Sequence, residues 1–255
     1  LFQTAGNIIE LIEKDDIPKY LLFLENVFPY MDNYNYQKGM KAIIQELKNF
    51  LKRKDIGTDS DRALLLDFQA TLEIKPEKAI KLEKDALAQI ENITADNARL
   101  VSNLHANLGG LYRMNGHPDL AREHMEKSIS LLDQFNLLHI NDSIPQIANY
   151  AMFLTKQQEP ERGISELQKL SGIIKEYHSD DCLDYAKVQE TLGTIYLMTA
   201  NLPQAKTHFK RAFKIYEKIW ADEPEMIEAK YQEIQELYPQ IGFCIGKNLS
   251  GLLTK

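Results

Sequence analysis

Side chains of the same kind recur along this chain every 42 residues. The interval is uninterrupted in one column of small residues, Ala79, Ala121, Gly163 and Ala205. Three prolines keep the same step, Pro76, Pro118 and Pro160, and Pro203 follows one residue late. Two apolar columns share the register: Leu66, Leu108, Tyr150, Leu192 and Ile234, then Ala70, Tyr112, Leu154, Tyr196 and Tyr238. Four columns in one register predict a chain built from copies of one structural unit.

Each unit has the features of two helices joined by a turn. Leu108 and Tyr112 are four residues apart, which puts both on one face of a first helix, A. A polar turn follows, and then a proline with an acid after it, such as Pro118-Asp119. Proline suits the first turn of a helix because its missing N–H is not needed there, and an acid favours a helix N-terminus. We therefore expect a second helix, B, to begin at each proline and to pack antiparallel to helix A.

The composition agrees with an all-α chain. Only three of the 255 residues are valine, whereas the residues that favour helices are abundant. Hydrophobic residues make up 44% of the chain, which is enough to bury a core. Lys and Arg number 30 against 37 Asp and Glu, and this net charge of −7 argues against a surface that binds a nucleic-acid backbone. No apolar run reaches the length needed to span a bilayer.

Two segments resemble the signature of the tetratricopeptide repeat. The first is Asn107-Leu108-Gly109-Gly110-Leu111-Tyr112 with Gly116 and Ala121 after it, and the second is Thr191-Leu192-Gly193-Thr194-Ile195-Tyr196 with Ala205, Phe209 and Ala212 after it. In the first unit, Asp67 and Glu83 depart from the pattern, because the family has a small and a large apolar residue there. The resemblance implies a right-handed α-solenoid of antiparallel helical hairpins. A period of 42 rather than about 34 residues implies longer helices, as in kinesin light chains and in bacterial peptide-sensing regulators with such repeats.

The repeat register divides the chain into three parts. Residues 59–226 are expected to form four hairpins, and residues 227–255 an incomplete repeat or capping helices. Residues 1–58 fit a cap, a degenerate repeat or the joint to an upstream domain. Further helices are predicted at residues 4–14, 17–30, 34–54 and 224–238. Because the first residue is Leu1 rather than Met, we also expect a longer parent polypeptide.

The sequence contains no constellation typical of catalysis or of a metal site. No pair of its six histidines has metal-ligand spacing on one helix. His124 and His208 occupy the same place two units apart, and we expect both on the surface of B helices. Cys182 and Cys244 show no metal-type spacing. Residues 242–247 look slightly like a phosphate-binding loop, but the segment is one residue short and lacks the final Ser or Thr. We therefore predict a chain that is not an enzyme and has no metal or cofactor.

The inner face of the solenoid, which the A helices line, is the remaining candidate for a site. Asn107 and Asn149 occupy the same place in successive units, and an amide can bond a peptide backbone of any sequence. The alternative is that each Asn bonds a neighbouring helix. Methionines on this face would adapt to varied apolar side chains. The candidate peptide-binding residues are Asn103, Asn107, Arg113, Met114, Asn149, Met152, Lys156, Lys187, Thr191 and Met198.

These observations favour a non-enzymatic module that binds a protein segment or peptide in its concave groove. The resemblance implies, more narrowly, the cytoplasmic sensor part of a bacterial signal-transduction or transcription regulator. Neither direct nucleic-acid binding nor a membrane association is expected of this segment. The alternative is a scaffold that self-assembles, for instance as a homodimer, through the ends of the solenoid.

Overall fold

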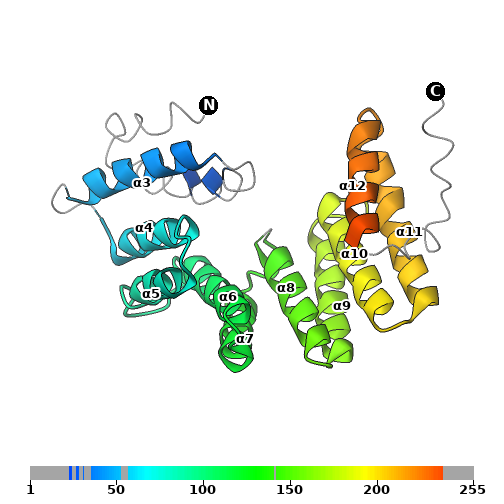
Figure 1. Ribbon diagram of the computed structural model, residues 1–255, viewed down its shortest axis with the longest axis horizontal. Coiled ribbons are helices and arrows are strands. Elements are labelled where there is room, and N and C mark those ends of the chain that lie inside the picture. The colour runs from blue at the N-terminus through cyan, green and yellow to red at the C-terminus, as the bar shows by residue number, and fades with distance from the viewer. Residues whose placement is uncertain are drawn as a thin grey trace. The chain divides into compact units, whose positions relative to one another are not determined.

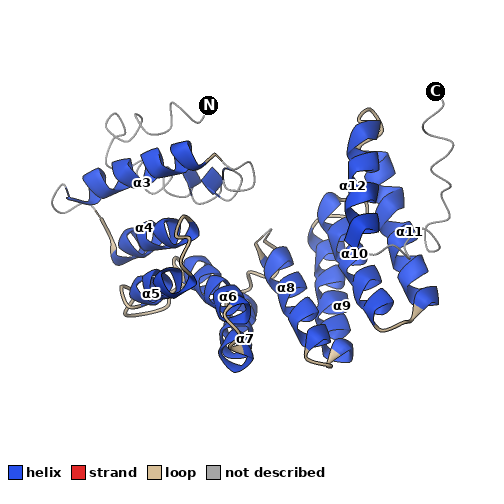
Figure 2. Cartoon of the chain, viewed as in Figure 1, coloured by secondary structure: helices blue, strands red, loops and turns tan. Residues whose placement is uncertain are grey.

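The chain is entirely helical where its structure is described (Figures 1 and 2). The computed structural model describes residues 23–24, 27–28, 31, 36–52, 57–140 and 142–237. Its helices are α3 (Gln37–Lys52), α4 (Asp59–Thr71), α5 (Pro76–Leu87), α6 (Ala98–Met114), α7 (Pro118–Gln134), α8 (Ser143–Lys156), α9 (Pro160–Tyr177), α10 (Leu183–Met198), α11 (Leu202–Ile219) and α12 (Pro224–Leu237). No helix in these ranges is both long enough and apolar enough to cross a bilayer.

Four helical hairpins follow one another, as the 42-residue register predicts. Helix α4 packs on α5, α6 on α7, α8 on α9 and α10 on α11. Pro76, Pro118 and Pro160 are the first residues of α5, α7 and α9, and Pro203 is the second residue of α11. The all-α fold and its paired A and B helices are therefore confirmed.

The small residues of the register let the two helices of a hairpin approach closely. Ala79, Ala121 and Ala205 are at most 2% exposed, and Gly163 is also buried. A methyl group added to Gly163 would lie 2.7 Å from the carbonyl oxygen of Ala151 on the facing helix. Because a Cβ atom does not fit at this distance, the backbones of α8 and α9 could not keep their separation with a larger residue there.

The turns between A and B helices share a backbone conformation that the sequence analysis did not identify. Gly116, Gln158 and Ala200 stand 42 residues apart, and their φ angles are 76°, 64° and 58°. In each turn the next N–H donates to a carbonyl in the last turn of helix A: His117 to Tyr112 at 2.9 Å, Glu159 to Leu154 at 2.9 Å and Asn201 to Tyr196 at 2.8 Å. This left-handed helix ending usually takes glycine, so Gln158 and Ala200 are strained there.

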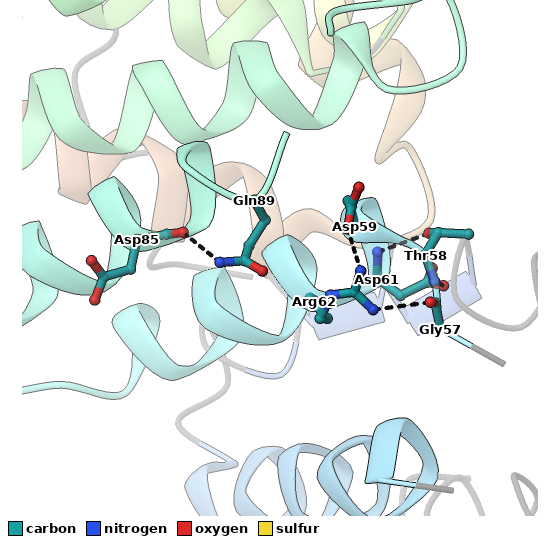
Figure 3. A network of polar contacts seen from close by, with 7 residues as sticks. All are labelled: Gly57, Thr58, Asp59, Asp61, Arg62, Asp85 and Gln89. Atoms are coloured by element: carbon teal, nitrogen blue, oxygen red, sulfur yellow. Dashed lines mark hydrogen bonds and ion pairs between the residues drawn. The ribbon is translucent and has the colours of Figure 1, made fainter. Parts of the chain in front are cut away.

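The first hairpin differs from the other three both in its turn and at the start of its first helix. Ile74 occupies the register position of Gly116, lacks the positive φ and is 92% exposed. A β-branched residue resists the left-handed conformation, and α4 ends earlier. At the start of α4, the Thr58 hydroxyl accepts from the N–H of Asp61 at 3.2 Å while the Asp61 carboxylate accepts from the N–H of Thr58 at 2.7 Å (Figure 3). This reciprocal cap fixes where the first hairpin begins.

The chain forms two compact units, Leu1–Phe135 and Asn136–Lys255. The first contains α3 to α7, and its core includes the stacked rings of Phe28 and Phe68, whose centroids are 3.9 Å apart. The second contains α8 to α12, where Phe213 packs edge-on against Tyr231. The boundaries that the repeat register places at residues 58 and 226 stay predictions.

The predicted terminal helices are described only in part. Helix α3 lies within the predicted range 34–54, and α12 within 224–238. The predicted helix 4–14 and most of 17–30 lie outside the described residues, as do Cys244 and the segment 242–247.

Candidate functional site: the exposed faces of the A helices

Helices α4, α6, α8, α10 and α12 are the A helices of the repeat. Within the first unit α4 packs on α6, and within the second unit α8 packs on α10. Successive A helices therefore lie side by side inside each unit, and residues in one register position become neighbours there.

In the first unit, α6 carries four of the candidate residues. Asn107, Arg113 and Met114 are exposed, and Asn103 is partly buried. Met114 is 73% exposed, which is unusual for a large apolar side chain. The face of α6 that packs on its neighbours is instead lined by residues such as Leu104 and Leu108, which are fully buried.

Asn107 does not point freely into solvent. Its Nδ2 donates to Oδ1 of Asp67 on α4 at 2.9 Å. The alternative that this Asn bonds a neighbouring helix is thus realised for its amino group. Contact of the remaining amide oxygen with a ligand stays a prediction.

Asp67 in turn hydrogen-bonds with Glu83 on α5, whose side chain is only 2% exposed. Burial, together with the nearby charge of Asp67, raises the pKa of Glu83 to about 10. Burial also raises the pKa of Asp67, to about 6, against the lowering effect of its hydrogen bonds to Glu83 and Asn107. At neutral pH the pair therefore holds one proton, on Glu83, and one negative charge, on Asp67.

In the second unit, α8 carries Asn149, Met152 and Lys156. Asn149 and Lys156 are exposed and Met152 is partly buried. The buried side of α8 includes Tyr150 and Leu154. The register position of Asn107 is therefore exposed again on α8.

The candidate residues of α10 are partly engaged with their own helix. Lys187 lies 3.6 Å from a carboxylate oxygen of Asp184, and the Thr191 hydroxyl donates to the carbonyl oxygen of Lys187 at 3.0 Å. Met198 is 40% exposed. Thr191 is therefore a weaker candidate for ligand contact than Asn149, because its hydroxyl proton is already used.

A charged network on the second unit was missed by the sequence analysis. Glu190 of α10 accepts from the Tyr216 hydroxyl of α11 at 2.6 Å and lies 3.1 Å from Nζ of Lys230 on α12. The carboxylate of Glu190 raises the pKa of Lys230 against the opposing effect of burial. These contacts tie α12 to α10, so Glu190 serves the packing of A helices. In the sequence, the only sign of this network was an acid on one A helix and a base on the next A helix.

Two histidines stand in the same register and have the same kind of surroundings. His124 on α7 stacks on Tyr112, and His208 on α11 stacks on Tyr196, with ring centroids 5.4 and 5.3 Å apart. The prediction that both histidines lie on the surface of B helices is correct only in part. Both are on B helices, but both rings are partly buried between helices A and B. Stacking on the Tyr of the facing helix explains why this position repeats.

Each of these histidines also bonds helix A. The Nδ1 atoms of His124 and His105 are 2.8 Å apart, and Nδ1 of His208 donates to Oε1 of Gln189 at 2.9 Å. Burial lowers the pKa values of His105 and His208 to about 4 and also lowers that of His124. All three rings are therefore neutral at pH 7. Within the described ranges, no group of three or more His, Cys, Asp or Glu could hold a metal ion.

A small polar pocket of about 270 Å³ lies elsewhere on the first unit, beside the start of α4. Its polar groups are already used locally: Asp59 pairs with Arg62 (Figure 3), and Oδ1 of Asn97 accepts from the N–H of Thr94 at 2.8 Å. Its lining is Thr58, Asp59, Ser60, Ile90, Glu91, Asn92 and Asn97. We do not assign it a ligand.

These features define an α-helical repeat protein with polar and methionine side chains exposed on its A helices. Residues 143–218, which span α8 to α11, match the family model of the tetratricopeptide repeat. This part of the chain therefore consists of tetratricopeptide repeats, a class of module that generally mediates protein–protein interactions. No curated protein matches the sequence.

Solved structures with a similar fold are helical-repeat proteins. BtubC (BKLC) from P. vanneervenii is 17% identical, with a TM-score of 0.53 over 78% of this chain and 72% of that one. A kinesin light chain-type protein with nearly identical TPR-like repeats from Podosopora anserina is 12% identical, with a TM-score of 0.58 over 79% of this chain and 98% of that one. At these identities the similarity concerns the fold alone.

Proposed function

We propose that the exposed faces of the A helices bind an extended segment of a protein or peptide. The observation that carries this proposal is that the same register position of an A helix exposes an amide in each unit, Asn107 in the first and Asn149 in the second. In each unit, such an amide can pair with the backbone of a bound segment.

The neighbouring side chains complement such a ligand. Met114 and Met198 offer exposed, adaptable apolar surface for its side chains. Arg113, Lys156 and Lys187 are exposed cations that would pair with acids in the ligand. Affinity would then come from backbone hydrogen bonds and a few apolar anchors.

The proposal can be tested with peptides selected from a random phage library on the immobilised chain. The double change Asn107→Ala and Asn149→Ala should weaken binding of the best selected peptide by roughly tenfold or more. Circular dichroism checks that the fold is kept, and the single change Asn149→Ala separates ligand contact from loss of the hydrogen bond between Asn107 and Asp67. The matched control is Gln168→Ala on the exposed side of the B helix α9, which should bind like the wild type. Equal affinity of the double variant and the wild type would refute the proposal.

Self-assembly is the alternative function, with a second copy as the partner of the solenoid ends. Sedimentation of the chain over a wide concentration range distinguishes the two. A monomer at every concentration argues against self-assembly and leaves peptide binding in place.

The narrower proposal is that the module is the sensor part of a larger bacterial regulator in the cytoplasm. Its support is the resemblance of the long-period repeats to those of peptide-sensing regulators. The reading frame of the parent gene tests it: an ATPase or DNA-binding domain encoded before Leu1 would support it, and a start codon adjacent to Leu1 would refute it.

A further inference from the structure

The first hairpin departs from the repeat at two facing positions, of which Glu83 is buried and Asp67 partly buried. The position of Asp67 on helix A is Gly109, Ala151 and Gly193 in the other three hairpins, and the position of Glu83 on helix B is Met125, Leu167 and Phe209. In two of those hairpins a large apolar side chain lies against a glycine: a Cβ added to Gly109 would lie 2.6 Å from Met125, and one added to Gly193 would lie 3.0 Å from the ring of Phe209. Only the first hairpin replaces this contact with two carboxyl groups. The fold does not require them, since three hairpins form without them.

The two carboxyl groups reach the A-helix face through Asn107. Nδ2 of Asn107 lies 2.9 Å from Oδ1 of Asp67, and the same amide also hydrogen-bonds with Glu83. Oε2 of Glu83 is buried without a hydrogen-bond partner. An incompletely bonded buried carboxyl group is costly, which indicates a role other than stability.

The single proton shared by Asp67 and Glu83 determines which end of the Asn107 amide is left for a ligand. With Glu83 protonated and Asp67 ionised, Asp67 is only an acceptor, so the amide of Asn107 turns its NH₂ group toward it. The amide oxygen of Asn107 then remains for a hydrogen-bond donor, such as a backbone N–H of a bound segment. Asn149 is also exposed, but the register positions of the carboxyl pair in the hairpin before it are Gly109 and Met125.

We propose that the Asp67–Glu83 pair is a proton-dependent positioning device that holds Asn107 with its oxygen toward a donor group of the ligand. This inference deepens the proposed function and rests on it. When the pair takes up a second proton, Asp67 becomes a neutral acid that can donate to the Asn107 oxygen. The amide then turns over, and the A-helix face loses the acceptor that the ligand uses.

The other titratable groups near the pair include two histidines, whose pKa values are shifted in the opposite direction. The groups that act on Asp67 are Glu83 of α5 and the amide of α6. The next titratable cluster on α5, α6 and α7 is His105 with His124, flanked by Lys84 and Lys127. Burial lowers the pKa values of both histidines, whereas it raises that of Asp67. A step that disappears in Asp67→Asn therefore reports the carboxyl pair rather than the histidines.

The test is a pH titration of the side-chain amide signals of Asn107 by ¹H–¹⁵N NMR, without any ligand. We expect the signals of Asn107 to shift in one step between about pH 7.5 and pH 5 and those of Asn149 to remain constant. Asp67→Asn should abolish the step, whereas Glu83→Gln should retain it because glutamine replaces a carboxyl group that is already neutral. A purely structural role for the pair predicts no pH-dependent change of the amide in any variant.

The outcomes separate this inference from the proposed function. A constant Asn107 signal in the wild type, or an unchanged step in Asp67→Asn, would overturn the positioning role whether or not peptides bind. If the step is present and no peptide is selected, the positioning device stands and the proposed ligand is wrong. If both hold, affinity of the selected peptide should fall by about tenfold over the same pH range.

Discussion

Replacing Glu83 with glutamine should stabilise the protein, and the gain should grow as the pH rises. The side chain is 2% exposed and neutral in the folded protein, whereas a free glutamate ionises above its ordinary pKa of 4.5. Because the folded-state pKa is raised, the folded protein holds a proton that the unfolded chain releases. Wild-type stability therefore falls as the pH rises above 4.5. Glutamine keeps a neutral hydrogen-bonding group of the same shape and removes this dependence.

The magnitude follows from the proton linkage. Each pH unit between the unfolded and folded pKa values costs about 1.4 kcal/mol. Between about pH 6.5 and pH 8 the advantage of Glu83→Gln over the wild type should therefore grow by about 2 kcal/mol. The histidines titrate equally in both proteins, so their contribution cancels in the difference.

Urea unfolding followed by far-ultraviolet circular dichroism measures this difference at each pH. The only tryptophan, Trp220, lies in the second unit, so its fluorescence serves as an internal reference away from the substitution. Glu77→Gln, at the exposed start of the same helix, is the matched control and should show no growth of the difference with pH in this range. A stability difference between Glu83→Gln and the wild type that stays constant over this range would refute the reasoning.

Two further predictions concern the repeat register. Gln158→Gly and Ala200→Gly should each raise the free energy of unfolding by up to about 1 kcal/mol, because φ is positive at both positions; Ala88→Gly, at a position with φ of −69°, should lower it in the same urea assay. His105→Gln installs the residue that the register has at position 189. A histidine whose pKa is lowered by folding makes the wild type lose stability as the pH falls below 6.5, so this variant should retain about 2 kcal/mol more stability at pH 5. Equal acid sensitivity of variant and wild type would contradict it.

The helices and their pairing could be predicted from the sequence because they depend on neighbours close along the chain. Pro118 at the start of α7 and the four-residue spacing of Leu108 and Tyr112 act within a turn or two of helix. The exposure of Asn107 and Asn149 could be predicted for the same reason, since it depends only on which side of each helix is apolar.

Contacts between side chains of different helices were decided by the tertiary structure alone. The positions of Asp67 and Glu83 were visible as departures from the repeat, but the amide of Asn107, 40 residues beyond Asp67, joins them only because α4 packs on α6. The stacking of His124 on Tyr112 likewise needs the antiparallel approach of α7 to α6. Helix formation follows from local spacing, whereas hydrogen bonds and pKa shifts depend on which side chains meet, and how deeply, once the helices are packed.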